Sequence, residues 1–267
     1  MTTTRFERDT AVERVGDGVF EARLDPGWWV MAGPNGGYLA AILVRALEAA
    51  VADPARTARS LTIHYTRVPV EGVARIETRL ERAGGALSTL SARLFQSGQL
   101  VALALAAFSR PRTTGIELCE ARMPEVPPPA GCPPLERRIP IHQRYEHRWA
   151  IGAQPFSGGD RALAGGWIRL AEPRCVDAAQ AAAFADAFPP AIFSAPQVER
   201  LAGGVPTIDL NVHFRASLPR AGAAADAFTL AVFRSRVARE GFVEEDGELW
   251  SEDGVLLAQS RQLALAR

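Results

Sequence analysis

The side chains of this sequence that could do chemistry are carboxylates, hydroxyls and amides, because the commoner nucleophile and metal motifs are missing. All thirty basic residues are arginines, and a chain without lysine can form neither a Schiff base nor a Walker-type phosphate loop. Cys119, Cys132 and Cys175 form no Cys-x-x-Cys pair and have no zinc-like spacing. We therefore expect inert cysteines in a reducing compartment.

The hydrophobic pattern predicts the elements that position these side chains, in two similar series. The first series is a helix over 35–52 and strands near 61–66, 73–82, 87–96 and 99–108. The second is a helix over 177–193 and strands near 207–215, 227–238, 242–250 and 255–265. The strand at 207–215 alternates strictly, which predicts Leu210 on one face and Thr207 and Asp209 on the other.

A proline-rich segment separates the two series. Seven prolines lie between Met123 and Pro140, and such a run favours extended chain rather than a central strand or helix. We therefore divide the chain into an N-terminal unit over 1–115, a linker over 116–140, and a C-terminal unit over 141–267 that carries the candidate site.

The two units are similar enough to indicate an internal duplication. Ile63-His-Tyr matches Val212-His-Phe at an offset of 212 − 63 = 149, and Gly98-x-Leu-Val-Ala matches Gly254-x-Leu-Leu-Ala at 254 − 98 = 156. A duplication of about 120 residues explains both matches. We expect an α+β fold in which each unit has one or two strands, a long helix and then an antiparallel meander of about four strands, and in which the two sheets join.

The second copy carries polar groups where the first does not. Local offsets pair Asp186 with Asn35, Thr207 with Ala58, and Gln262 with Ala106. In the last strand, Leu103-Ala-Leu-Ala becomes Gln259-Ser-Arg-Gln, which costs packing unless a polar site needs it. Structural alternatives remain for each residue: a helix cap for the aspartate, an ordinary strand residue for the threonine, and a solvated edge strand for the glutamines. His64 and His213 occupy equivalent positions, which favours a structural role.

Several motifs together resemble the type II (TesB-like) acyl-CoA thioesterases. They are Trp28-Trp29, Pro34-Asn-Gly-Gly-Tyr-Leu-Ala-Ala, Gly166-Trp-Ile-Arg, Ala183-Phe-Ala-Asp-Ala-Phe-Pro-Pro-Ala, Thr207-Ile-Asp-Leu-Asn-Val-His-Phe-Arg and Leu257-Ala-Gln-Ser-Arg-Gln. The resemblance covers nearly the whole chain and keeps the motif order. It implies a double hotdog fold, in which two antiparallel sheets each wrap a central helix and join into one continuous sheet.

The resemblance also implies a reaction and its residues. The family hydrolyses acyl-CoA thioesters with an Asp, a Thr and a Gln that position a water, and these fall on Asp186, Thr207 and Gln262. Gln259 is the alternative amide, because one strand slip exchanges the two glutamines. The expected substrate-binding residues are Trp28, Gly36, Gly37 and Tyr38. The glycines would let the substrate approach backbone N–H groups that hold an oxyanion, while the aromatic pair has a core role as its alternative.

Composition limits partners and location. The net charge is zero, which argues against a nucleic-acid partner, and the longest apolar run has nine residues (100–108), too few to span a membrane. We expect a cytoplasmic homo-oligomer, dimer or tetramer, that takes acyl-CoA in fatty acid metabolism and needs no metal or organic cofactor. A non-catalytic acyl-CoA binding protein and a hotdog enoyl-CoA hydratase remain as alternatives, although no His lies near Asp186 to suit the hydratase.

Overall fold

The strands of both halves join one antiparallel sheet in the computed structural model, which describes residues 3–31, 33–113, 115–136, 139–196 and 204–266. The first half supplies β1 (Glu13–Gly16), β2 (Val19–Leu24), β5 (Thr57–Tyr65), β6 (Gly72–Ala83), β7 (Leu87–Gln96) and β8 (Gln99–Ser109). The second supplies β9 (Tyr145–Ile151), β10 (Leu163–Leu170), β11 (Thr207–Phe214), β12 (Thr229–Arg234), β13 (Ala238–Arg239), β14 (Phe242–Ser251) and β15 (Leu256–Leu265).

The order of these strands keeps the two halves apart within the sheet. It runs β1-β2-β6-β7-β8-β5-β11-β15-β14-β12-β10-β9, with β13 beside β14, over the described residues. The halves meet where β5 pairs with β11, so the expectation of one continuous sheet is confirmed. A separate two-stranded ribbon, β3 (Trp29–Val30) with β4 (Gly33–Pro34), precedes the first long helix.

The long helix α2 (Gly36–Val51) closely matches the helix expected over 35–52. The side chain of Asn35 caps its start by accepting a hydrogen bond from the Tyr38 N–H, and Ala52 ends it in a left-handed conformation. Ten of its sixteen residues are buried. A helix that is apolar on most sides must lie inside the molecule, and α2 is indeed covered by the sheet and by the second half.

The second helix is shorter than expected. α3 covers Ala178–Phe184, not 177–193, and a 3-10 turn, η4, follows at Ala191–Ser194. Proline explains the early end, because the ring of Pro189 would clash with the carbonyl of Ala185 in a continuing helix. Asp186 therefore lies in a turn after α3.

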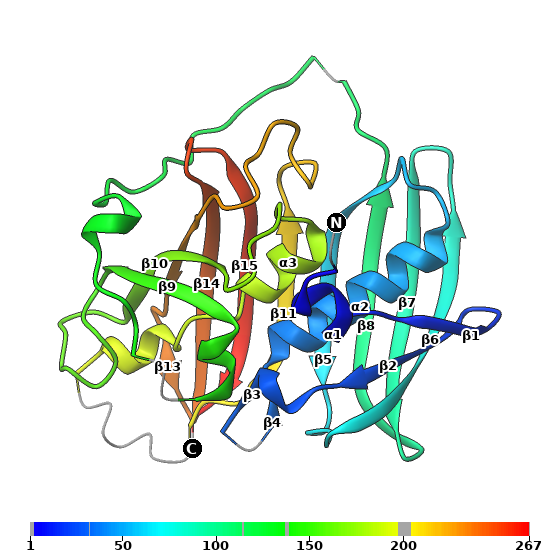
Figure 1. Ribbon diagram of the computed structural model, residues 1–267, viewed down its shortest axis with the longest axis horizontal. Helices are drawn as coiled ribbons and strands as arrows, with labels where there is room; N and C mark the ends of the chain where they lie inside the picture. Colours follow the sequence, from blue (N-terminus) through cyan, green and yellow to red (C-terminus); the bar gives the residue numbers. More distant parts are fainter. Residues whose placement is uncertain (1–2, 32, 114, 137–138, 197–203, 267) are drawn as a thin grey trace.

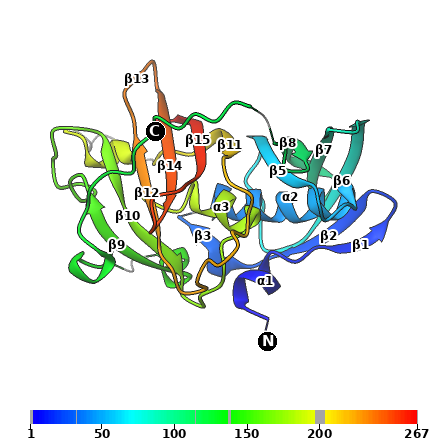
Figure 2. The ribbon, with the colours of Figure 1, turned by 90° about the horizontal axis from the view of Figure 1, so that it is seen from above.

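Both helices lie on the same face of the sheet, which is called the inner face here (Figures 1 and 2). α2 and α3 pack against each other where the two halves meet. The sheet curves around them, with β9 and β10 at one end and β1 and β2 at the other (Figure 2). Groups from both halves are thus brought together at the helix ends.

The junction of the halves has an approximate two-fold relation. Thr62 on β5 pairs directly with Asn211 on β11, and these two residues are equivalents at the offset of 211 − 62 = 149. Their side chains share a hydrogen bond, with the Thr62 hydroxyl 2.8 Å from the Asn211 Oδ1. Pairing between equivalent residues is what a duplicated unit gives when its two copies meet about a two-fold axis.

The proline-rich linker contacts the outer face of the second half. Cys132 is buried there with Trp167, Leu230 and Trp250, and Met123 packs against the same cluster. The chain arches from β8 across to this half (Figure 1). Most of the described residues of the linker expected over 116–140 are exposed, and residues 137 and 138 lie outside the described residues. The linker therefore covers apolar surface as well as joining the halves.

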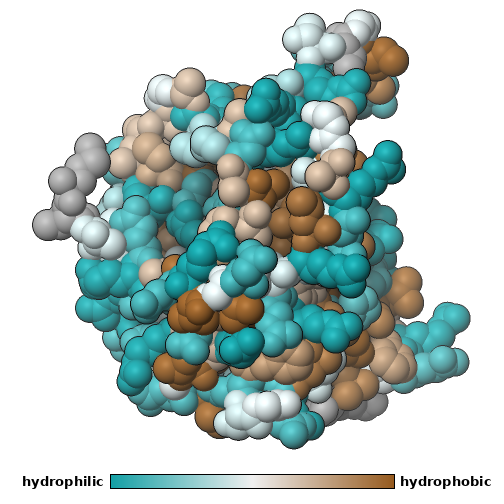
Figure 3. All heavy atoms as spheres, turned by 90° about the vertical axis from the view of Figure 1, so that its right-hand side faces the viewer, coloured by the Kyte–Doolittle hydropathy of each residue, from teal (hydrophilic) through white to brown (hydrophobic). Residues whose placement is uncertain are grey.

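The remaining outer surface is mixed in polarity. Figure 3 shows apolar patches interspersed among polar side chains on one side of the molecule. Leu80, Leu87 and Leu105 are among the exposed apolar residues of the first half. None of the described helices is long and apolar enough to cross a membrane.

Candidate active site

Asp186, which belongs to the second half, lies at the N-terminal end of α2, the long helix of the first half. The Asn35 Nδ2 donates to its Oδ2 at 2.9 Å and to its backbone carbonyl at 2.7 Å, and the Gly37 N–H donates to the same Oδ2 at 3.0 Å. The positive end of α2, sixteen residues long, favours a carboxylate at this place. Asn35 and Asp186 are equivalent residues of the two copies, and here they bind each other.

The surroundings of Asp186 oppose its charge on balance. Burial raises the pKa of Asp186 to about 6, against hydrogen bonds from Gly37, Gly36, Gln262 and Asn35, which favour the ionised form. The residue as a whole is half-buried. A carboxyl group in this state can take a proton near neutral pH.

The two glycines of the helix start lie against the second half of the chain. A Cβ at Gly37 would lie 2.5 Å from the Ala183 carbonyl oxygen, and one at Gly36 would lie 3.0 Å from the Asp186 Oδ2. The glycines thus permit close approach of the second half's polypeptide, and the Gly37 N–H is already bound to Asp186. A role for them in holding substrate or oxyanion stays a prediction.

Thr207 points to the inner face, where strict alternation had wrongly put it on the outer one. Opposite it on β15 is Ala264, and opposite Leu210 is Gln262, so all four share the inner face. The register shifts by one residue between Thr207 and Asp209, which reverses the side-chain direction of Thr207 relative to the rest of β11. The first half repeats this bulge between Ala58 and Ser60.

Gln262, rather than Gln259, is the amide beside Thr207. The Thr207 hydroxyl donates to the Gln262 Oε1 at 3.0 Å, and Gln262 also contributes a hydrogen bond that lowers the pKa of Asp186. Gln259 lies on the outer face, where it accepts a hydrogen bond from Arg215 at 2.8 Å. The three residues named by the resemblance are therefore brought together from the turn after α3, β11 and β15.

A fourth polar residue, Glu245, was missed in the sequence. It lies opposite Gln262 in the β14–β15 ladder and is 6% exposed. Its Oε1 accepts from the Gln262 Nε2 at 2.7 Å, and its Oε2 accepts from the Ala191 N–H at 2.5 Å. The available signal was its position: in the β14 pleat it falls on the inner face with Val243 and Leu249.

Trp28 and Tyr38 are core residues in this structure. Their rings stack with centroids 5.2 Å apart, and they are 1% and 0% exposed. The Trp28 Nε1 donates to the Asp9 side chain and the Tyr38 hydroxyl to the Asp9 carbonyl. They support the start of α2 from within, and direct contact of either with substrate stays a prediction.

The phenol of Tyr145 is a buried polar group whose pKa is affected by Asp186. Its side chain is 1% exposed, and its hydroxyl has no hydrogen-bond partner in the described part of the chain. Burial raises its pKa well above the usual range, and the charge of Asp186 adds to this effect. Across the described residues, no group of three or more His, Cys, Asp and Glu could hold a metal ion.

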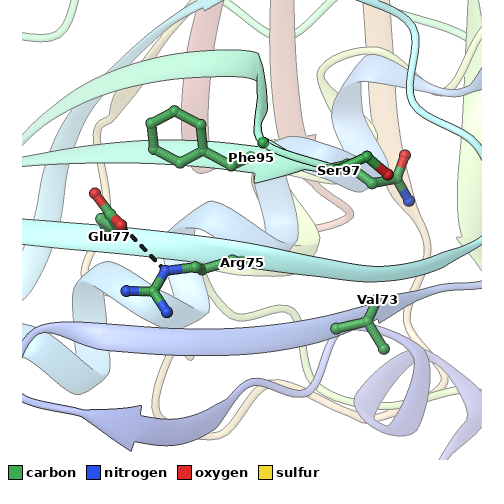
Figure 4. A pocket seen from close by; sticks show the side chains of 7 residues that line it. Val73, Arg75, Glu77, Phe95 and Ser97 are labelled. Carbon is green, nitrogen blue, oxygen red and sulfur yellow. Dashed lines mark hydrogen bonds and ion pairs between the residues drawn. The ribbon is translucent and has the colours of Figure 1, made fainter.

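A surface depression of about 280 Å³ lies elsewhere, on β6, β7 and the turn after β7 (Figure 4). Its charged residues, Arg75 and Glu77, are 3.1 Å apart and neutralise each other. Neither side chain belongs to the inner face, since Ala74 and Ile76, which alternate with them along β6, are the buried residues of this strand. The depression is therefore separate from the Asp186 site.

Comparison with protein families places the chain. The model of the acyl-CoA thioesterase C-terminal domain matches residues 120–266, and that of the N-terminal domain matches residues 25–109. The chain belongs to the acyl-CoA thioesterase family. The resemblance found in the sequence motifs is thereby confirmed. Comparison with curated proteins found no significant match.

Solved structures of similar proteins agree with the thioesterase-family fold. A hot dog fold protein of unknown function from Alicyclobacillus acidocaldarius is 29% identical, with a TM-score of 0.87 over 100% of this chain and 99% of that one. A Thermobifida fusca protein, provisionally described as a thioesterase II, is 26% identical with a TM-score of 0.84 over 100% and 99%. An acyl-CoA thioesterase II from Mycobacterium marinum, 21% identical over 98% of both chains, shares the fold with a TM-score of 0.77.

Proposed function

We propose that this protein hydrolyses acyl-CoA thioesters to free acid and CoA, with Asp186 as the base for a water that Thr207 and Gln262 orient. The observation that carries the proposal is the meeting of these three groups: a 3.0 Å Thr207–Gln262 hydrogen bond beside a carboxylate whose pKa burial raises to about 6. Membership of the acyl-CoA thioesterase family supports the choice of substrate.

The reaction needs only a base and a well-oriented water. Asp186 takes a proton from the water while the water oxygen attacks the thioester carbonyl carbon. The tetrahedral intermediate then loses the CoA thiolate by cleavage of the carbon–sulfur bond, and the thiolate takes up the proton. General-base catalysis of this kind contributes typically ~10²–10⁴-fold, and orientation of the water adds to it. No covalent acyl-enzyme is formed.

The proposal includes a double hotdog organisation with one unit over 1–115, a linker over 116–140, and a second unit over 141–267. The self-pairing of the equivalent residues Thr62 and Asn211 supports it, as does the bulge repeated in β5 and β11. In this organisation the first unit supplies the helix start that holds Asp186, and the second supplies the reacting groups.

Release of free thiol from a panel of acyl-CoAs tests the proposal. We expect Asp186→Asn to lower kcat by about 10²-fold or more with little change in KM, because the amide cannot accept the proton. Thr207→Ala and Gln262→Ala should each cost less, and their losses should not add, since they act on one water. Asp209→Asn is the matched control, because Asp209 lies on β11 with Thr207 but on the outer face. This variant should keep wild-type turnover.

Several outcomes would contradict the proposal. Unchanged turnover in Asp186→Asn would return this residue to a structural role. Burst kinetics, or an acylated Thr207 in a mass spectrum, would make the threonine a nucleophile. Tight acyl-CoA binding without thiol release would favour a non-catalytic binding protein, and loss of the enoyl absorbance without thiol release would favour a hydratase.

A further inference from the structure

A buried carboxyl group beside the proposed catalytic residues has no part in the mechanism given above. Glu245 is 6% exposed on the inner face of β14, and both its oxygens accept hydrogen bonds, from Gln262 and from the Ala191 N–H. In the described part of the chain it forms no ion pair. A buried carboxyl that costs folding free energy and has no cationic partner suggests a functional role.

We infer that Glu245 is a positioning residue that fixes which way the side-chain amide of Gln262 faces, and thereby the hydrogen-bonding roles of Thr207 and Asp186. The inference rests on the hydrolysis proposed above. An amide has one end that donates and one that accepts, whereas an ionised carboxylate only accepts. Glu245 therefore binds the NH₂ end of the Gln262 amide, whose Nε2 lies 2.7 Å from the Glu245 Oε1. The carbonyl end of the amide then faces away from Glu245.

The direction of the amide determines what the other two residues can do. The Gln262 Oε1 faces Thr207 at 3.0 Å, so the Thr207 hydroxyl uses its proton there and keeps its lone pairs for a water. The amide also contributes a hydrogen bond to the ionised form of Asp186. A reversed amide would present its oxygen to the Asp186 carboxylate and its NH₂ to Thr207, which removes that hydrogen bond and changes how the water is held.

The Glu245 carboxyl group can gain or lose a proton near neutral pH. Burial raises the pKa of Glu245 to about 7, and the charges of Asp186, from the turn after α3, and of Glu244, on the same strand, act in the same direction. The Ala191 N–H and the Gln262 amide oppose this rise. When protonated, Glu245 becomes a donor and can bind the carbonyl end of Gln262, so the reversed amide becomes available.

The variant Glu245→Gln tests the inference, because it keeps the size of the side chain and removes its obligate acceptor character. We expect kcat to fall by about tenfold while KM stays within about twofold, since the change affects water orientation rather than substrate binding. In the wild type, the rise of kcat between pH 5 and 8 should depend on two groups, Asp186 and Glu245, whereas in Glu245→Gln it should depend on Asp186 alone. The rise should also move to lower pH in the variant, because the negative charge of Glu245 no longer raises the pKa of Asp186. Glu248→Gln, on the outer face of the same strand, is the control and should leave kcat and its pH profile unchanged.

A second measurement needs no substrate. In ¹⁵N-labelled protein, the side-chain NH₂ signals of Gln262 are identified by their loss in Gln262→Ala. We expect them to shift in two steps between pH 5 and 8 in the wild type and in one step in Glu245→Gln. Identical titration in both proteins would overturn the inference, as would wild-type kcat and pH profile in Glu245→Gln.

The two proposals fail in different ways. If Asp186→Asn loses turnover while Glu245→Gln matches the wild type in kinetics and NMR, the inference about Glu245 is wrong and the proposed hydrolysis stands. If Asp186→Asn keeps turnover, the proposed function is wrong, and the NMR titration still reports whether Glu245 orients the amide.

Discussion

Two opposing effects act on the pKa of Asp186: burial raises it and hydrogen-bond donors lower it. Burial has the larger effect. The pKa is raised to about 6, although Gly37, Gly36, Gln262 and Asn35 all favour the carboxylate. The pKa of an ordinary aspartate is about two units lower, so its carboxylate is a weaker base. The donors keep the group ionised at pH 7, and burial makes it basic enough to take a proton from water. Both effects are needed for the proposed role.

The raised pKa predicts a pH-dependent cost in stability. The folded state binds more protons than the unfolded state between about pH 4, near the ordinary value, and the raised pKa near 6. The contribution of Asp186 to the free energy of unfolding therefore falls as pH rises through this window, by up to about 3 kcal/mol. Asp186→Asn should gain stability relative to the wild type on going from pH 4.5 to pH 8.

Urea unfolding of both proteins at the two pH values measures this difference. Asp209→Asn serves as the control, because its carboxyl lies on the outer face of β11. A stability difference between Asp186→Asn and the wild type that is the same at pH 4.5 and 8 would show that the carboxyl is not buried as described.

Sequence reasoning named Asp186, Thr207 and Gln262, which the structure brings together, and missed Glu245. The contrast between Gln262 and Ala106 in equivalent strands was visible because a polar residue replaced an apolar one. Glu245 lies in the acidic run 244–246, which resembles an ordinary solvent-exposed segment. Only the pleat of β14 places the middle acid inside and its neighbours outside, and the phase of that pleat is fixed by pairing with β15.

At the scale of elements, irregular backbone accounts for part of what the sequence did not predict. A single bulge between Thr207 and Asp209 reverses the direction of Thr207, and periodicity carries no sign of it. β10 falls where one or two strands were expected before the second helix, but Gly165 and Gly166 lower its strand propensity and its bounds were not predicted. A Cβ at Gly165 would lie 2.3 Å from the Ala231 carbonyl oxygen, so close strand approach requires glycine there. The long regular strands β6, β7 and β8 were predicted nearly residue for residue.

The contact between the start of α2 and the end of α3 yields another prediction. Gly37→Ala should destabilise the protein by about 1–3 kcal/mol, because the new methyl group would lie 2.5 Å from the Ala183 carbonyl oxygen. It should also lower kcat, since Asp186 would be displaced from the helix start. Gly85→Ala is the control: nothing lies within 4 Å of its added methyl group, so stability should change by less than about 0.5 kcal/mol.

Thermal unfolding and thiol release, measured on both glycine variants, check this prediction. If Gly37→Ala keeps wild-type stability and kcat, the close approach of the two halves at this glycine is not what positions Asp186.

At the scale of the whole molecule, the proposed function makes the two halves unequal. The positions equivalent to Asp186, Thr207 and Gln262 are Asn35, Ala58 and Ala106, and both alanines are buried. Asn35 cannot act as a base, and in this structure it binds Asp186 instead. The halves therefore contribute unequally to one site.

One productive acyl-CoA site per chain follows from this asymmetry. Isothermal titration with a non-hydrolysable acyl-CoA analogue should give a stoichiometry of one, and Asp186→Asn should keep it because binding does not depend on the base. A stoichiometry of two equivalent sites per chain would contradict the reading of the first half as lacking a site.

The bulge shared by β5 and β11 has an evolutionary consequence. Both copies carry the bulge at equivalent positions. The backbone that turns a side chain toward the helices was therefore present before the two halves diverged. In the first half that position holds Ala58, a methyl group where the second half has a hydroxyl. Under the proposed function, the two halves therefore differ at this position by a side chain and not by the path of the strand.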